Sequence, residues 1–167
     1  RFADAGYDVF HDADRISGEI VVVNTCGFIG DAKEESIEMI LQLAEAKKRR
    51  RIGKLFVMGC LSERYRQELT EEIPEVDRFY GKFDWDSLLS DLGHSEVTCS
   101  TARILTTPSH YAYIKIAEGC NRFCSYCAIP LITGRFQSYP MEQILDEVRA
   151  LVAAGVKEFQ IIAQDLS

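Results

Sequence analysis

Two apolar segments with a helical pattern between them restrict the fold of this chain more than any other feature. Residues 19–24 are a β-branched run of the kind that fills a strand buried on both faces of a sheet, and residues 54–58 are a second strand-like run. Between them, Ile37, Ile40 and Ala44 follow helical spacing after a capping pattern that begins at Asp31. The pattern predicts a helix over residues 32–49. Strand, helix and strand together predict a parallel βαβ unit.

Each of these two strands ends beside a cysteine. Cys26 follows the first run and Cys60 follows the second, and each cysteine is adjacent to a glycine. The carboxyl ends of parallel strands lie at the same edge of a sheet, so we expect the two thiols to meet there. Free cysteine is also among the most buried residue types, which leaves ordinary core packing as the alternative. We favour metal ligation because both residues follow strands at one edge.

The rest of the chain predicts shorter elements and then a second unit. Helices are expected near residues 62–69 and 84–92, and the polar, Ser- and Thr-rich stretch 93–109 is expected to be a linker. Residues 111–116 alternate in polarity as a half-buried strand does, Pro140 opens a helix that Gly155 ends, and residues 159–163 form the next strand. We therefore predict an α/β protein. An open parallel-sheet domain occupies residues 1–92, a linker residues 93–109, and the first units of a (β/α) barrel residues 110–167.

Three cysteines lie close together in the loop after the strand at residues 111–116. They are Cys120, Cys124 and Cys127. A structural zinc site or a fully protein-ligated [4Fe–4S] cluster takes four ligands, whereas three thiolates leave one iron open for a substrate or cofactor. Two alternatives stay open. A thioredoxin-like Cys-x-x-Cys should begin a helix, but residues 128–139 separate the motif from the predicted helix. A zinc site needs a distant fourth ligand such as His110 or Cys99, and we interpret Cys99 as non-ligating because no motif surrounds it.

Composition restricts the class of protein. The chain has 167 residues with 19 Lys and Arg against 26 Asp and Glu, a net charge of −7, so it lacks the basic excess of nucleic-acid-binding domains. No apolar stretch reaches the roughly 18 to 20 residues that span a bilayer, and no signal peptide pattern is present. We expect no membrane contact and a cytoplasmic, reducing compartment, where clustered cysteines more often bind metal than form disulfides. The sequence opens at Arg1 without a methionine, so we expect it to be part of a longer protein.

The loop, with its aromatic residue directly before the third cysteine, resembles the cluster motif of the radical S-adenosylmethionine (SAM) superfamily. The resemblance implies that Cys120, Cys124 and Cys127 hold a [4Fe–4S] cluster whose open iron binds SAM. Reductive cleavage of SAM then gives a radical that abstracts hydrogen from an unactivated C–H bond. The resemblance also places Tyr126 near the adenine. Gln164, at the end of the strand at residues 159–163, is placed to approach SAM. The alternatives are a packing aromatic for Tyr126 and a solvated turn residue for Gln164.

Residues 24–29 and 57–62 narrow the resemblance to the methylthiotransferases within that superfamily. This implies a second, auxiliary [4Fe–4S] cluster, held by Cys26, Cys60 and a cysteine upstream of Arg1. Residues 26–36 and 127–130 look most like the members that modify a ribosomal protein. The alternatives are a tRNA adenosine methylthiotransferase and a non-enzymatic iron–sulfur or zinc binding module.

The implied reaction adds a methylthio group to the β-carbon of an aspartate of a small-subunit ribosomal protein. An electron donor protein is the implied second partner, and RNA contact is expected only through a C-terminal domain outside this sequence. No residue stands out as a catalytic acid or base. We expect residues 1–167 alone to be inactive, because two strands of a (β/α) barrel cannot enclose a radical.

Overall fold

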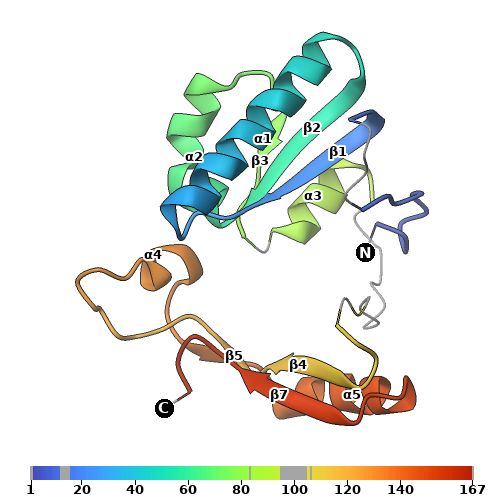
Figure 1. Ribbon diagram of the computed structural model, residues 1–167, viewed down its shortest axis with the longest axis vertical. Coiled ribbons are helices and arrows are strands. Elements are labelled where there is room, and N and C mark those ends of the chain that lie inside the picture. Colours follow the sequence, from blue (N-terminus) through green and yellow to red (C-terminus); the bar gives the residue numbers. More distant parts are fainter. Residues whose placement is uncertain (1, 12–15, 83, 95–104, 106, 167) are drawn as a thin grey trace. The chain divides into compact units, whose positions relative to one another are not determined.

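The computed structural model describes residues 2–11, 16–82, 84–94, 105 and 107–166. The chain divides into two compact units, Arg1–Val97 and Thr98–Ser167 (Figure 1). Cys99 and most of the predicted linker lie outside the described residues, so the linker at residues 93–109 stays a prediction. None of the described helices has both the length and the apolar character needed to cross a membrane.

The first unit contains a parallel sheet with the strand order β1-β2-β3. Its elements are β1 (Gly18–Thr25), α1 (Gly30–Lys48), β2 (Ile52–Gly59), α2 (Cys60–Glu72), β3 (Arg78–Phe79) and α3 (Trp85–Asp91). Strand β1 pairs with β2 from Gly18 opposite Ile52 to Thr25 opposite Gly59. The predicted βαβ unit is therefore confirmed, and helix α1 begins and ends close to the expected positions.

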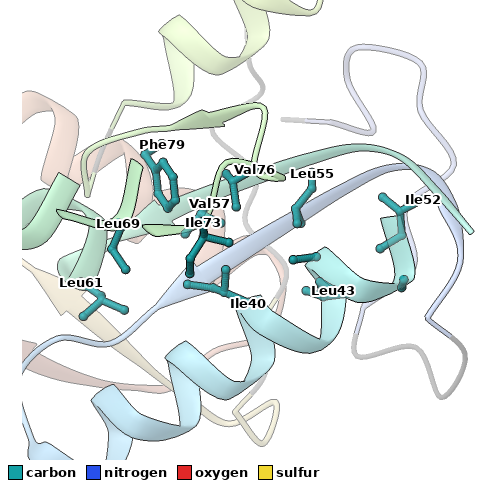
Figure 2. Close-up of a cluster of buried hydrophobic side chains, with 12 residues drawn as sticks. Ile40, Leu43, Ile52, Leu55, Val57, Leu61, Leu69, Ile73, Val76 and Phe79 are labelled. Atoms are coloured by element: carbon teal, nitrogen blue, oxygen red, sulfur yellow. The ribbon is translucent and has the colours of Figure 1, made fainter. Parts of the chain in front are cut away.

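Alternating residues of β2 separate two apolar layers. Leu55 and Val57 pack with α1 and α2 on one face of the sheet, as Figure 2 shows. Phe56 and Met58 pack on the other face with Tyr80 and with residues of α3. Each fully buried side chain of this size contributes about 1.5–3 kcal/mol to folding. Covering both faces of the sheet fixes its register, because a shift by one residue would exchange the two layers.

Two details of the first unit differ from the sequence-based expectation. Residues 20–23 of β1 are half-buried, because within the described residues β1 pairs only with β2 and lies at an edge of the sheet. The predicted cap at Asp31 is wrong, since α1 begins at Gly30 after Ile29, whose side chain makes no capping hydrogen bond. Asp31 lies in the first helical turn, where its negative charge suits the positive end of the helix dipole.

The second unit contains a second parallel βαβ arrangement. Its elements are β4 (Tyr111–Lys115), β5 (Ala117–Glu118), α4 (Ile129–Thr133), β6 (Gln137–Ser138), α5 (Met141–Ala153) and β7 (Glu158–Ile162). Strands β4 and β7 are parallel, and Ala112 and Ile114 of β4 pack against Leu151 of α5. Gly155 has φ +98° after the end of α5, as expected for a helix-ending glycine. The predicted α/β fold class is confirmed.

Candidate metal centres

Cys26 and Cys60 lie next to each other at the carboxyl edge of the first sheet. Thr25 and Gly59 are paired across β1 and β2, and the two cysteines are the residues that follow them. Both cysteines are half-buried. The structure therefore brings together the two sequence-predicted residues of this edge, as parallel strand ends require.

Glycines make this close approach sterically feasible. Gly59 has φ +111°, and a Cβ atom there would lie 2.4 Å from the carbonyl oxygen of Thr25. A Cβ atom on Gly27 would lie 2.8 Å from the backbone nitrogen of Leu61. Only a residue without a side chain fits at either position. The glycine beside each cysteine is thus explained by backbone packing at the strand ends.

Ser36 of α1 holds the backbone of Cys26. The Cys26 N–H donates to Ser36 Oγ at 3.1 Å, and the Ser36 hydroxyl lies 2.7 Å from the carbonyl oxygen of Ala32. The segment that leaves β1 is thereby fixed to the helix that follows it. No sequence pattern predicts this role for Ser36, and the available signal is a small hydroxyl side chain in the interior of a helix.

The cysteine loop of the second unit starts directly after β5. Cys120 is buried, Cys127 is half-buried and Cys124 is exposed, and all three are free thiols. The Cys120 N–H donates to the carbonyl oxygen of Gly134 at 3.2 Å. A Cβ atom on Gly119, where φ is +76°, would lie 2.2 Å from the carbonyl oxygen of Arg135. The start of the loop is therefore pressed against the segment that follows α4.

The sequence predicts no helix directly after the Cys-x-x-Cys pair, and this expectation is wrong. Helix α4 begins at Ile129, two residues after Cys127. It has five residues, however, and it starts after the second cysteine of the Cys-x-x-Cys pair. The motif itself therefore does not form the N-terminus of a helix, which is the arrangement that lowers a thiol pKa in thioredoxin-like proteins.

The chemical type of the ligand atoms determines which metal group the cysteines can bind. Within the described residues, no group of three or more His, Cys, Asp or Glu side chains is arranged to hold a single metal ion. A [4Fe–4S] cluster makes a different demand, because cysteine thiolates bind its separate irons. The candidate donors at the sheet edge and in the cysteine loop are all cysteine thiols, which are the usual ligands of iron–sulfur clusters. The residues therefore fit a cluster in chemical type.

An ion pair connects the cysteine loop to the end of β7. Arg122 Nε lies 2.9 Å from Asp165 Oδ2, and Cys120 Sγ lies 3.8 Å from the same oxygen. The backbone N–H of Arg122 donates to Cys120 Sγ at 3.4 Å. The hydrogen bond and charge of Asp165 raise the pKa of Arg122, with smaller contributions from Cys120 and Cys124. The sequence patterns gave no indication of a role for Arg122.

Gln164 lies beside Asp165 in a polar cluster. Its Nε2 donates to Glu118 Oε1 at 2.7 Å, and Glu118 also pairs with Lys115 and accepts a hydrogen bond from Tyr139. Gln164 Oε1 is buried and has no hydrogen-bond partner among the described residues. A buried acceptor without a donor costs about 1–3 kcal/mol, so this oxygen suits a donor supplied by a ligand. Gln164 as a whole is half-buried.

Tyr126 points into solvent within its unit. Its side chain is 93% exposed, and the neighbouring Phe123 is 77% exposed. Tyr126 therefore does not belong to the apolar core of the described residues. An exposed aromatic ring between two ligand candidates is free to stack on a planar ring of a bound molecule.

Comparison with known proteins finds two family matches along the chain. Residues 1–81 match the family described as "Uncharacterized protein family UPF0004". Residues 114–165 match the radical SAM superfamily. The first match covers most of the unit that contains Cys26 and Cys60, and the second covers the cysteine loop and Gln164.

Curated relatives match the whole chain. A protein of Parabacteroides distasonis is 68% identical over 170 residues, which cover 100% of this chain and 39% of the relative. A protein of Bacteroides fragilis is 65% identical over 167 residues, covering 98% of this chain and 38% of the relative. A protein of Chlorobium chlorochromatii is 48% identical over 169 residues, covering 99% and 38%. All three are named "Ribosomal protein uS12 methylthiotransferase RimO". The chain thus spans about two fifths of the length of these relatives.

Proposed function

We propose that this chain belongs to the radical SAM methylthiotransferases, because its curated relatives are named methylthiotransferases and its cysteine loop matches the radical SAM superfamily. The protein that contains it transfers a methylthio group to the β-carbon of an aspartate of ribosomal protein uS12. The observation that carries the proposal is the meeting of Cys26 and Cys60 at one sheet edge. A radical SAM enzyme needs only the three-cysteine loop, so a second thiol pair in another unit calls for a second metal group.

One cluster is assigned to the cysteine loop of the second unit, and another to Cys26 and Cys60 of the first unit. Cys120, Cys124 and Cys127 hold one [4Fe–4S] cluster, and Cys26 and Cys60 contribute to an auxiliary one, completed by a cysteine upstream of Arg1. When bound, the first cluster and SAM supply one-electron radical chemistry that activates an unreactive C–H bond. Cys120 is buried and Cys127 is half-buried, whereas Cys124 is exposed.

Gln164 and Tyr126 are the proposed SAM contacts. SAM carries an ammonium group and hydroxyl groups, and either can donate to the buried Gln164 Oε1 that lacks a partner. Glu118 fixes the amide orientation by accepting from Gln164 Nε2, which leaves Oε1 as the available acceptor. The exposed ring of Tyr126 is available to stack on adenine.

The proposal includes the partners and the compartment. A one-electron donor protein must reduce the first cluster before each SAM cleavage, and uS12 is the acceptor substrate. We place the activity in the cytoplasm, where reduced thiols persist. RNA contact, if the enzyme acts on assembled ribosomal subunits, is assigned to parts of the protein outside this sequence, because the chain itself carries a net charge of −7.

The substrate assignment is tested on the full-length protein, reconstituted with iron and sulfide without oxygen. The assay offers uS12 and tRNA separately, with SAM and dithionite, and detects methylthiolated aspartate or adenosine by mass spectrometry. Product on uS12 supports the proposal. Product on tRNA alone would instead identify a tRNA adenosine methylthiotransferase.

The cluster assignment is tested with cysteine variants of the same protein. Cys124→Ala should abolish SAM cleavage and lower the iron content by about one cluster, because three thiolates are the minimum ligand set of that site. Cys99→Ala is the matched control and should retain both iron and cleavage. An iron-loaded parent protein that never cleaves SAM would favour a non-enzymatic iron–sulfur module.

A further inference from the structure

Arg122 occupies an unusual position for a charged residue. It lies between the first and second cysteines of the loop, and its side chain reaches Asp165, 43 positions along the chain at the end of β7. The same Asp165 oxygen that accepts from Arg122 Nε lies 3.8 Å from Cys120 Sγ. One cation and one anion therefore stand beside the buried thiol of the loop.

The two charges differ in exposure. The Arg122 side chain is 64% exposed and the Asp165 side chain 17% exposed. The guanidinium charge is consequently screened more by water and salt than the carboxylate charge. The Arg122 backbone N–H, in contrast, makes a direct contact with Cys120 Sγ at 3.4 Å.

We propose that Arg122 and Asp165 are a positioning pair that sets the reduction potential of the cluster held by the cysteine loop. Arg122 raises the potential and Asp165 lowers it, while their ion pair ties the loop to the end of β7. The proposal rests on the cluster assignment of the proposed function. It assigns neither residue to the chemistry of SAM or of the substrate.

The direction of each effect follows from charge. Reduction adds one electron to the cluster and its thiolates, so a nearby cation stabilises the reduced form and a nearby anion destabilises it. A unit charge on the order of 7 Å away in a water-like medium changes such a one-electron equilibrium about threefold. For a one-electron couple this ratio corresponds to about 28 mV.

The test is a redox titration of the full-length protein, reconstituted without oxygen and measured without SAM. Cys26→Ala and Cys60→Ala are present in every sample, so the signal comes from the loop cluster. Dithionite supplies the electron through mediators, and the reduced cluster is counted by its electron paramagnetic resonance signal. The variants are Arg122→Gln, Arg122→Lys and Asp165→Asn. Arg149→Gln is the control, since Arg149 pairs with Asp146 on the exposed side of α5.

The expected shifts have opposite signs. Arg122→Gln lowers the ratio of reduced to oxidised cluster about threefold at a set potential, and Asp165→Asn raises it at least as much. Arg122→Lys keeps the charge and stays near the parent, as does Arg149→Gln. The shift in Arg122→Gln shrinks at high salt because that charge is exposed. A merely structural contact would move both variants in the same direction or leave both at the parent value.

Several outcomes overturn the inference. Equal potentials in all variants, or shifts of one sign in Arg122→Gln and Asp165→Asn, exclude a charge effect while leaving the proposed function intact. If Arg122→Gln binds no cluster, the proposal is tested with Asp165→Asn and Arg122→Lys instead. An unchanged or lowered reduction potential in Asp165→Asn then rejects it. A parent protein that holds no cluster in this loop rejects both the inference and the proposed function.

Discussion

The hydroxyl oxygen of Ser36 lies 3.1 Å from the backbone nitrogen of Cys26, so a residue inside helix α1 fixes the position of a candidate ligand at the end of β1. This contact couples the order of the helix to the order of the cysteine. Mutation of this contact can therefore be followed by two separate measurements, the stability of the first unit and the retention of metal at its sheet edge.

Ser36→Ala should weaken metal retention more than folding. Loss of one such hydrogen bond costs about 0.5–1.5 kcal/mol, because the part-buried Cys26 N–H loses its acceptor. We expect faster loss of the auxiliary cluster to a chelator, followed by iron release from the full-length protein. Thr70→Ala is the matched control, since the Thr70 hydroxyl donates to the carbonyl oxygen of Arg66 within α2 and not to the backbone of a cysteine. Equal release rates in the two variants would contradict the role of Ser36.

Gly59→Ala should disrupt the sheet edge. A residue with a side chain is strained at φ +111°, at a cost of about 1–3 kcal/mol, and its Cβ would also collide with the Thr25 carbonyl oxygen. We expect a lower midpoint of thermal unfolding and loss of iron from the auxiliary site.

Gly30→Ala is the control for Gly59→Ala. A Cβ atom on Gly30 meets no atom within 4 Å, and Gly30 starts helix α1. Alanine there should be neutral or stabilise by up to about 1 kcal/mol. Similar midpoints in the two variants would argue against the steric requirement at Gly59.

The sequence predicted the parallel strands and the meeting of Cys26 with Cys60, because strand burial and helix periodicity extend over many residues. Short elements carry no such period. Helix α4 has five residues and β5 and β6 have two each, so nothing in their sequence distinguishes them from loop.

Contacts between side chains that are distant in the sequence could not be predicted from it either. The Arg122 to Asp165 pair depends on where the loop folds relative to β7, and the buried oxygen of Gln164 depends on Glu118, 46 positions away. Periodicity locates the backbone segments, but the partner of a long polar side chain is decided by packing. The metal-ligand roles of the five cysteines remain proposals for the experiments described above.

Gln164→Leu should weaken SAM binding while the cluster is retained. The substitution removes both the donor to Glu118 and the unpartnered Oε1, so the ligand loses an acceptor worth about 0.5–1.5 kcal/mol, or roughly twofold to tenfold in Kd. Equilibrium dialysis with SAM on the iron-loaded full-length protein measures the change. Gln67→Leu, on the exposed surface of α2, is the control. An unchanged Kd in Gln164→Leu would remove Gln164 from the proposed SAM site.

Asp77 should make the first unit less stable in acid. Burial alone raises the pKa of Asp77, but hydrogen bonds from Lys47 and from the Leu55 N–H, with the charge of Lys47, outweigh it, so the pKa lies below its ordinary value. A carboxyl with a lowered folded-state pKa stabilises above its unfolded pKa of about 3.9, and this stability is lost as pH falls through the folded value. Since the side chain is 37% exposed, we expect a contribution of only about 1 kcal/mol. Asp77→Asn should lower the midpoint of thermal unfolding at pH 7, and the midpoints of the variant and the parent should converge in acid. Asp146→Asn, which removes an exposed ion pair, should leave the midpoint at pH 7 unchanged. A gap between parent and Asp77→Asn that stays constant with pH would show that its charge does not stabilise the fold.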